Sequence, residues 1–267
     1  MITCDVYGHD PTSNNGLGNQ MFCIAASIGL ANRLQTQAFF PDLNLKHYEY
    51  YGDTIFHKLS REHKIQQIVN SYKEPPYTST RYNEIPLQDN MKISGFFQSY
   101  KYFNFCRDEI LNLFQVCDPM EQKIINNYGM YLDSNVASIH VRRADYLKFS
   151  GHYENLGISY YKKAIDLFPE TQIIFVFSDD IKWCKKHLPS FGKLNIYVEG
   201  QTDVEDLWLM TKMKNNIIAN STFSWWGAYL NKNQNRVVAP TKWFGPKRTA
   251  DNSLETKDLY PDNWETI

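Results

Sequence analysis

The chain has 267 residues, enough for one large domain or two small ones, because single cores usually run to roughly 100–200 residues. Lys and Arg number 28 and Asp and Glu number 29, so the formal net charge is -1. That balance excludes a globally basic nucleic-acid binder and a charge-repelled disordered chain, and the 43% of hydrophobic residues can form a core.

No stretch of the sequence has the pattern of a membrane span or of a secretory signal. The longest nearly apolar run, residues 21–31, falls short of the ~18 residues that a membrane helix needs. The N-terminus lacks a basic region followed by an apolar stretch. The five cysteines form no C-x-x-C pair, so neither a zinc site nor a disulfide framework is indicated. These features predict a soluble, cytoplasmic protein with reduced thiols.

The first half of the chain mixes helical, extended and loop patterns. Small and apolar residues on most faces predict an early helix, and prolines mark turns in a long polar and aromatic connection. The expected elements, in chain order, are a helix at 19–34, a strand at 38–40, a polar connection at 42–90, a strand at 91–97, and helices at 100–114 and 119–128.

The second half alternates short apolar strands with helices, and Ser159 is the expected N-cap of its first helix. Continuous apolar strands that alternate with helices predict a parallel sheet covered on both faces. We therefore predict an α/β protein with an N-terminal domain at 1–132 and a C-terminal domain at 133–267. Expected strands lie at 136–141, 173–177, 194–198, 217–219 and 237–239, and expected helices at 159–168, 180–187, 204–213 and 222–230.

In open sheets of this kind, ligands bind beyond the carboxyl ends of the strands. The sequence HVRRAD, from His140 to Asp145, follows the strand at 136–141. Arg142 and Arg143 supply two planar cationic forks, which suit a diphosphate better than a single carboxylate. Asp145 is a candidate to orient one of them or to cap the next turn. The alternative is a salt-bridge network that ties the strand end to a helix.

A second candidate is the turn that begins with Asn220, Ser221 and Thr222, between the strand at 217–219 and a helix. All three are capping residue types, and amide hydrogens exposed at a helix start bind anions. A phosphate there would meet backbone donors, hydroxyls and the helix dipole together. The alternative is simple helix capping, which contributes about 1 kcal/mol.

A third strand end carries Ser178, Asp179 and Asp180. A carboxylate just past a strand can accept hydrogen bonds from the two N–H groups on a guanine edge, which makes Asp179 a candidate for base recognition. The alternative is that Asp180, or Asp179 itself, is the N-cap of the following helix.

A glycine turn, Gly16-Leu-Gly18-Asn19, opens the first expected helix. It is superficially similar to G-x-G-x-x-G, but Met21 occupies the third glycine position and a long polar loop precedes the turn. A dinucleotide-binding motif is therefore rejected. Gly16 and Gly18 are expected to allow a positive φ or a close backbone approach.

Five segments together resemble one enzyme family. In chain order they are GLGNQMF, GFFQSYKYF at 95–103, HVRRADY, FSDD and NNIIANSTFSWWGAYLN at 215–231. Over about residues 14–245 the chain resembles the α-1,2-fucosyltransferases of glycosyltransferase family 11. The resemblance implies a GT-B fold, in which two Rossmann-like halves face each other across a cleft. It also implies GDP-fucose as the donor, held mainly by the C-terminal half, inversion at the anomeric carbon and no obligatory metal or other cofactor.

The resemblance further implies a role for each matching residue. Arg142 or Arg143 would clamp the diphosphate, His140 would lie along the nucleoside and Asp179 would contact guanine. Asn19 would act at the junction of fucose and acceptor, and its alternative role is to cap the first helix. The remaining expected contacts are Ser221, Thr222 and Phe223 on phosphate oxygens, Asn220 and Ser178 in the donor site, and Gly18 and Gln20 near the sugars.

These expectations combine into transfer of L-fucose from GDP-fucose to the 2-hydroxyl of a terminal galactose-type residue. Residues 7–15 are an insertion where an acceptor would approach, so the acceptor's identity stays open. The expected partners are GDP-fucose and a galactoside glycan, with peripheral membrane contact where that glycan is lipid-linked, and no nucleic acid. No general base is assigned, although the available groups are Asp5, His9, Asp10 and Asp145.

Three alternatives stay open. A fucosyltransferase of another linkage, α-1,6 or protein O-linked, would also have an arginine after a strand and a phosphate-binding turn. A non-catalytic glycan-binding protein would explain the 15% of aromatic residues but has no need of a diphosphate clamp. An enzyme that modifies nucleotide sugars, such as an epimerase, is disfavoured by the missing dinucleotide motif.

Overall fold

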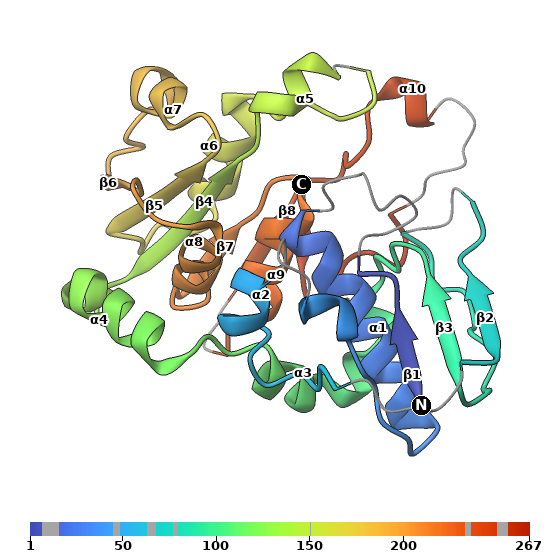
Figure 1. Ribbon diagram of the computed structural model, residues 1–267. Coiled ribbons are helices and arrows are strands. Elements are labelled where there is room, and N and C mark those ends of the chain that lie inside the picture. Colours follow the sequence, from blue (N-terminus) through green and yellow to red (C-terminus); the bar gives the residue numbers. More distant parts are fainter. Residues whose placement is uncertain are drawn as a thin grey trace. The chain divides into compact units, whose positions relative to one another are not determined.

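The computed structural model describes residues 1–6, 16–44, 49–62, 68–76, 80–149, 151–232, 236–249 and 256–267. The insertion at 7–15, with His9 and Asp10, lies outside the described residues. The chain forms two compact units, which are Met1–Cys117 with Ser253–Pro261, and Asp118–Asn252 with Asp262–Ile267 (Figure 1).

The division between the units falls earlier in the chain than the expected boundary after residue 132. Helix α4 (Asp118–Leu132) belongs to the second unit, although the sequence placed it in the first. Its buried Ile124 packs in one cluster with Val136 and Phe175, which lie on strands of the second unit. Residues 133–135, just after the expected boundary, are therefore the connection from this helix to the first strand of its own sheet.

The first unit is built on a small parallel sheet. Among the described residues, three strands pair in the order β1 (Ile2–Cys4), β3 (Met91–Ser94), β2 (Asn70–Lys73). Helix α1 (Leu17–Arg33) is buried along most of its length and contacts β1. The unit's other elements are η1 (Pro41–Asn44), α2 (Glu49–Asp53), η2 (Tyr100–Tyr102), η3 (Asn104–Cys106) and α3 (Arg107–Leu113).

The sequence predicted α1 and β3 but missed several features of this unit. The expected strand at 38–40 is only an isolated bridge between Ile2 and Ala38. Strand β2 lies inside the stretch expected to be a connection, and its residues are half-buried or exposed, so they carry no apolar signal. The expected helix at 100–114 is divided into η2, η3 and α3, and Phe103 between the first two has φ -143°.

The second unit contains a larger parallel sheet. Within the described chain its six strands follow the order β6-β5-β4-β7-β8-β9, and the neighbouring strands pair in parallel, as predicted. The strands are β4 (Val136–Val141), β5 (Ile173–Ser178), β6 (Leu194–Tyr197), β7 (Asn215–Ile217), β8 (Arg236–Ala239) and β9 (Glu265–Thr266). The helices are α4, α5 (Ala144–Lys148), α6 (Ile158–Asp166), α7 (Ile181–His187), α8 (Asp203–Met210), α9 (Thr222–Tyr229) and α10 (Pro246–Thr249).

Helices cover both faces of this sheet, because the residues of its central strands alternate between two cores (Figure 1). On one face Ile139 and Val141 of β4 pack with residues of α6 and α7. On the other face Val136 packs with residues of α4 and α8. Because of this alternation, successive residues just after β4 point to opposite faces of the sheet.

The helix starts of the second unit differ from one expectation and agree with another. Gly157, not Ser159, is the N-cap of α6, so that expectation is wrong. Asp180 is the N-cap of α7, and its carboxylate accepts a hydrogen bond from the Trp183 amide at 3.1 Å. The helix-cap alternative for Asp180 is therefore confirmed.

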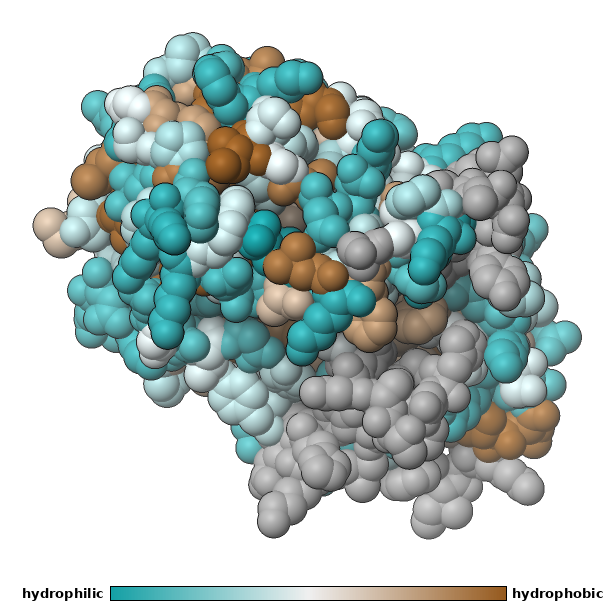
Figure 2. All heavy atoms as spheres, turned by 90° about the horizontal axis from the view of Figure 1, so that it is seen from above, coloured by the Kyte–Doolittle hydropathy of each residue, from teal (hydrophilic) through white to brown (hydrophobic). Residues whose placement is uncertain are grey.

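The five cysteines all lie in described ranges and are free thiols, four of them buried. Among the described residues no helix is long and apolar enough to span a bilayer. Seen from above, the described surface is mostly hydrophilic, with its hydrophobic residues in small separate groups (Figure 2).

The glycine in the middle of α1 provides a test of packing in the first unit. A Cβ atom on Gly29 would lie 2.1 Å from the Tyr102 carbonyl oxygen, a backbone atom that cannot move aside alone. We expect Gly29→Ala to lower the free energy of unfolding by about 1–3 kcal/mol, measured by urea titration. Gly129→Ala, in α4, is the control: its Cβ would meet only the Ile125 side chain at 3.4 Å, so it should gain up to ~1 kcal/mol of helix propensity. Equal effects of the two changes would contradict this account.

Candidate functional site

The three polar motifs of the second half meet at one edge of the sheet. They follow β4, β5 and β7, which are neighbours in the order β5-β4-β7. All three strands are parallel, so their carboxyl ends lie together. The structure therefore brings together the residues that the sequence selected one strand end at a time.

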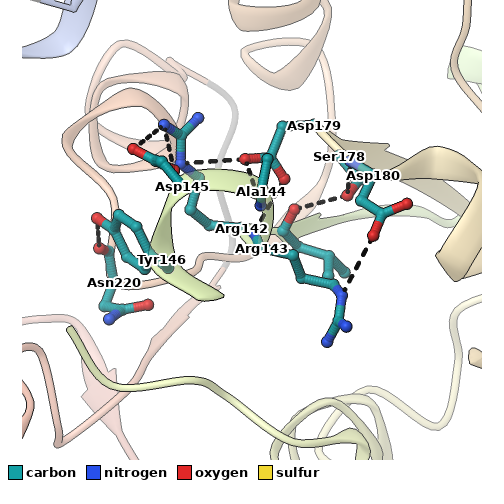
Figure 3. Close-up of polar contacts among 10 residues, drawn as sticks. Arg142, Arg143, Ala144, Asp145, Tyr146, Ser178, Asp179, Asp180 and Asn220 are labelled. Atoms are coloured by element: carbon teal, nitrogen blue, oxygen red, sulfur yellow. Dashed lines mark hydrogen bonds and ion pairs between the residues drawn. The ribbon is translucent and has the colours of Figure 1, made fainter. Parts of the chain in front are cut away.

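Arg142 is held by two carboxylates. One of its terminal nitrogens donates to Asp145 at 2.9 Å, and its Nε lies 3.2 Å from a carboxylate oxygen of Asp179 (Figure 3). The guanidinium also lies 5.5 Å from the centre of the Tyr146 ring. These contacts fix the orientation of the guanidinium while leaving the side chain about one-third exposed.

Arg143 points away from Arg142 (Figure 3). Its Nε lies 3.5 Å from Asp180, and its guanidinium carbon lies 3.7 Å from the centre of the Trp183 ring on α7. Successive residues after a strand point to opposite faces, which explains the divergence. The two arginines therefore do not form one two-pronged clamp, and the salt-bridge network weighed as the alternative is present.

Asp179 stabilises the turn that carries both arginines. Its two oxygens accept hydrogen bonds from the backbone amides of Arg143 at 2.9 Å and Ala144 at 3.2 Å, at the start of α5. Ser178 supports the same turn: its hydroxyl donates to the Val141 carbonyl at 2.8 Å and accepts from the Asp180 amide at 3.0 Å. Both residues position the strand end by contacts within the protein.

Asn220 is directed into the protein. Its amide nitrogen donates to the carbonyls of Glu154 at 2.9 Å and Trp243 at 2.8 Å. The backbone carbonyl of Asn220 accepts from the Tyr146 hydroxyl at 2.8 Å (Figure 3). Tyr146, which the sequence did not single out, thereby joins the arginine turn after β4 to the turn after β7.

The start of α9 has the features of an anion site. Ser221 occupies the N-cap position, but within the described chain its side chain caps no amide of the helix, and the first turn holds no acidic residue. The buried Ser224 secures the turn instead, because its hydroxyl accepts from the Ala219 amide at 3.2 Å and donates to the Ser221 carbonyl at 3.3 Å. The Ser221 hydroxyl and the first-turn amides, including those of Thr222 and Phe223, thus suit a phosphate.

His140 is buried beside this helix start. Its ring centre lies 5.5 Å from that of Phe223, and only 5% of the residue is exposed. Burial, and secondarily the positive charge of Arg142, lower the pKa of His140 to about 3, so the imidazole is neutral. Its Nδ1 is buried without a hydrogen-bond partner among the described residues. A neutral ring with one unused nitrogen can bind a ligand but cannot supply positive charge.

Asp206 on α8 is a further polar residue, half-buried, that the sequence did not single out. Its Oδ1 is buried and makes no hydrogen bond within the part of the chain that the structure describes. Burial, and then the charges of Asp203 and Glu205, raise the pKa of Asp206 to about 7. Glu205, by contrast, is fully used, because it completes the capping box with Thr202 and pairs with Lys123. The signal in the sequence was the first turn of α8, which holds more acidic residues than the helix cap uses.

The first unit places the glycine-turn residues differently from the expectation. Gly16 is the N-cap of α1 with φ -59°, and Gly18 lies inside the helix, so the positive φ, one of the two expectations, is wrong. A Cβ on Gly16 would meet nothing within 4 Å among the described residues, so no close backbone approach within the protein requires that glycine. Asn19 is not the cap, because it follows the helix start; its carbonyl oxygen accepts from the Gln98 amide at 2.9 Å. Asp5, one of the general-base candidates, pairs with Lys92 at 2.5 Å.

Comparison with known proteins shows which family and which relatives this chain resembles. The family model described as "Glycosyl transferase family 11" matches residues 7–267. The O-antigen biosynthesis glycosyltransferase WbnK of Escherichia coli is 32% identical, over 91% of this chain and 97% of the relative. An α-1,2-colitosyltransferase of Escherichia coli is 28% identical over 94% and 96%, and a galactoside 2-α-L-fucosyltransferase of Caenorhabditis elegans is 25% identical over 94% and 77%.

Solved structures confirm the fold. The NodZ α-1,6-fucosyltransferase, in crystals soaked with GDP-fucose, superposes with a TM-score of 0.56 over 88% of this chain and 93% of that one. Its sequence identity is 10%, so the likeness concerns architecture alone. The α/β chain with parallel sheets therefore has the GT-B fold that the sequence predicted.

Proposed function

The chain belongs to glycosyl transferase family 11, and we propose that it transfers L-fucose from GDP-fucose to the 2-hydroxyl of a terminal galactose-type residue, with inversion at the anomeric carbon. The linkage is the one named for the α-1,2-colitosyltransferase and for the galactoside 2-α-L-fucosyltransferase. The observation that carries the proposal is the pairing of an oriented Arg142 with the uncapped start of α9 at adjacent strand ends.

This arrangement suits the leaving group of the reaction. The acceptor oxygen bonds to the anomeric carbon as the bond from that carbon to the β-phosphate oxygen breaks. The electron pair leaves with GDP, and the hydroxyl proton is released. The guanidinium of Arg142 and the amides of α9 are held in place before the reaction, so they stabilise the growing negative charge without reorganising. Asp145 and Asp179 contribute by orienting Arg142.

We assign recognition of the guanine base to Asp206 and His140, and no longer to Asp179. Both oxygens of Asp179 already accept backbone hydrogen bonds. Asp206 retains a buried, unbonded oxygen among the described residues, and a carboxylate can accept from guanine N1–H and its 2-amino group. In support of a shared site, His140 packs on Phe223, and Phe223 packs against the core cluster that contains Leu209 and Met210 of α8, the helix that carries Asp206.

We also propose that no metal ion is required, because the guanidinium and the helix amides supply positive charge at the diphosphate. We expect fucose transfer to persist after treatment with EDTA, measured as GDP release with an acceptor present. Modest stimulation by Mg²⁺ is compatible with this, since the cation can assist product release. A complete loss that Mg²⁺ or Mn²⁺ restores would overturn the metal-free mechanism.

The experiment that tests the function is an acceptor screen followed by linkage analysis of the product. GDP-fucose and GDP-colitose are compared as donors, because one relative is named as a colitosyltransferase. We expect GDP release that depends on a galactoside acceptor, and an α-1,2-linked product. GDP release without any acceptor dependence, or an α-1,6 product, would contradict the proposal, and an absence of release with every pair would indicate a binding protein.

A further inference from the structure

The first unit has its own group of polar residues at the carboxyl edge of its sheet. Gln98 follows β3, Glu74 follows β2, and Asn19 lies at the start of α1. The Gln98 side-chain nitrogen donates to the Asn19 side-chain oxygen at 2.9 Å. Neither side chain of this amide pair carries a charge, so the pair suits a neutral polyhydroxy ligand better than a phosphate.

Gln98 retains hydrogen-bonding capacity for a ligand. The carbonyl oxygen of Gln98 makes no hydrogen bond within the described parts of the chain, although only 8% of the residue is exposed. The bond between the two amides also fixes which end of Gln98 is the acceptor. A sugar hydroxyl, which both donates and accepts, matches an acceptor presented in a fixed orientation.

Glu74 holds the turn from which Gln98 projects. Its carboxylate accepts hydrogen bonds from the backbone amides of Phe96 at 2.8 Å and Phe97 at 3.1 Å, and only 3% of the residue is exposed. The backbone at Gly95 passes so close that a Cβ there would lie 2.5 Å from the Glu74 Cβ. The carboxylate therefore replaces the strand partners that these amides lack beyond the end of β3.

Phe97 adopts a conformation that needs this support. Its φ is +47°, in the left-handed region that disfavours a bulky residue. The side chain is fully buried and packs edge-on against Tyr102 at 5.4 Å between ring centres. Phe97 directly precedes Gln98 in the chain, so the position of the Gln98 side chain depends on the Glu74 contacts.

We propose that Gln98 and Asn19 form a binding site for a hydroxyl of the acceptor sugar, and that Glu74 is the positioning residue that sets this amide pair. The assignment rests on the proposed function, because it names the acceptor side of the same reaction. The nucleotide and its diphosphate have their own charged and amide groups in the second unit. The acceptor is the uncharged substrate, and this is an uncharged site.

The surroundings of Glu74 make the site sensitive to pH. Burial raises the pKa of Glu74 to about 7, against the opposing effect of the two backbone amides. The titratable groups that face it are Cys23 on α1, Tyr72 on β2 and Tyr102 on η2, all of which are uncharged near neutrality. Ionised Glu74 accepts from the amides more strongly than the protonated form. The turn should thus hold Gln98 better above this pKa than below it.

Steady-state kinetics with GDP-fucose and lactose, a simple β-galactoside, test the proposal. We expect Gln98→Ala to raise KM for lactose about three- to ten-fold, the range for one neutral hydrogen bond, with KM for GDP-fucose unchanged. Wild-type KM for lactose should fall from about pH 6 to about pH 8. Glu74→Gln should remove that pH dependence, because one amide oxygen can still accept from both backbone amides.

Matched controls separate recognition from folding. Gln88→Ala and Glu84→Gln change exposed residues of the same unit and should leave both KM values unchanged. Glu74→Ala should raise KM for lactose, and Glu74→Gln keeps the test decisive if the alanine variant does not fold. Unchanged lactose kinetics in Gln98→Ala, or a rise confined to KM for GDP-fucose, would overturn the site while the proposed function stands. A wild-type protein that transfers fucose to no galactoside would overturn both.

Discussion

Replacing Arg142 with alanine is expected to lower kcat/KM for GDP-fucose by roughly 100- to 1,000-fold, whereas Arg143→Ala should lower it about ten-fold or less. Arg142 follows β4 on the face where His140 packs against Phe223 at the start of α9. Its carboxylate partners orient its fork at the carboxyl edge of the sheet, where we propose that the diphosphate binds. Arg143 is instead paired with Asp180 and Trp183 at α7. We therefore expect the loss of the Arg143 side chain to weaken a contact within the protein more than a contact with GDP-fucose.

The measurement is steady-state transfer by each variant, with the melting temperature recorded beside it. Arg142→Lys is the informative control, because it keeps the charge but loses the planar fork that meets Asp145 and Asp179. We expect it to recover only part of the lost activity. Equal activity in Arg142→Ala and wild type, at equal stability, would exclude Arg142 from the diphosphate site, and the reverse ranking of the two arginines would assign it to Arg143.

The affinity for GDP is expected to fall as pH decreases below about 7, by up to ten-fold per pH unit. Asp206 must be ionised to accept hydrogen bonds from guanine, and its pKa in the unliganded protein is raised to about 7 by burial and the neighbouring Asp203 and Glu205. Below that pKa, GDP must displace a proton in order to bind. Above that pKa the Asp206 carboxylate is already ionised, so the affinity for GDP no longer changes with pH. Calorimetric titration with GDP across this range measures the effect, with ADP as a poor competitor throughout.

Two variants serve as controls for this pH dependence of GDP affinity. Asp206→Asn should weaken GDP binding about ten- to a hundred-fold and remove the pH dependence, because the amide offers a donor where the carboxylate accepted. Asp203→Asn should keep full affinity at high pH and move the midpoint to lower pH, because the Asp203 charge helps to raise the pKa of Asp206. Equal inhibition by ADP and GDP, or an affinity that ignores pH in the wild type, would show that Asp206 does not read the base.

The second unit could be predicted from the sequence in some detail. Strands such as β4 and β5 are apolar runs buried on both faces, which only a covered parallel sheet produces. The first unit was harder because its strands are short and β2 is half-exposed. Such a segment forms a strand because it packs against a neighbouring strand, and no local sequence pattern indicates it.

Residue types and strand ends were therefore within reach of the sequence, since both depend on local patterns. The arginines after β4, the aspartates after β5 and the capping residues before α9 were all identified as site candidates from that position alone. Side-chain direction and partners were not, because they depend on which strands become neighbours and which face each helix covers. The opposite directions of Arg142 and Arg143 follow from the alternation after a strand, but their partners on other strands and helices do not. Only the tertiary structure directs Asn220 into the protein and bonds both oxygens of Asp179 to backbone amides. These hydrogen bonds join residues far apart in the chain, so no local pattern records them.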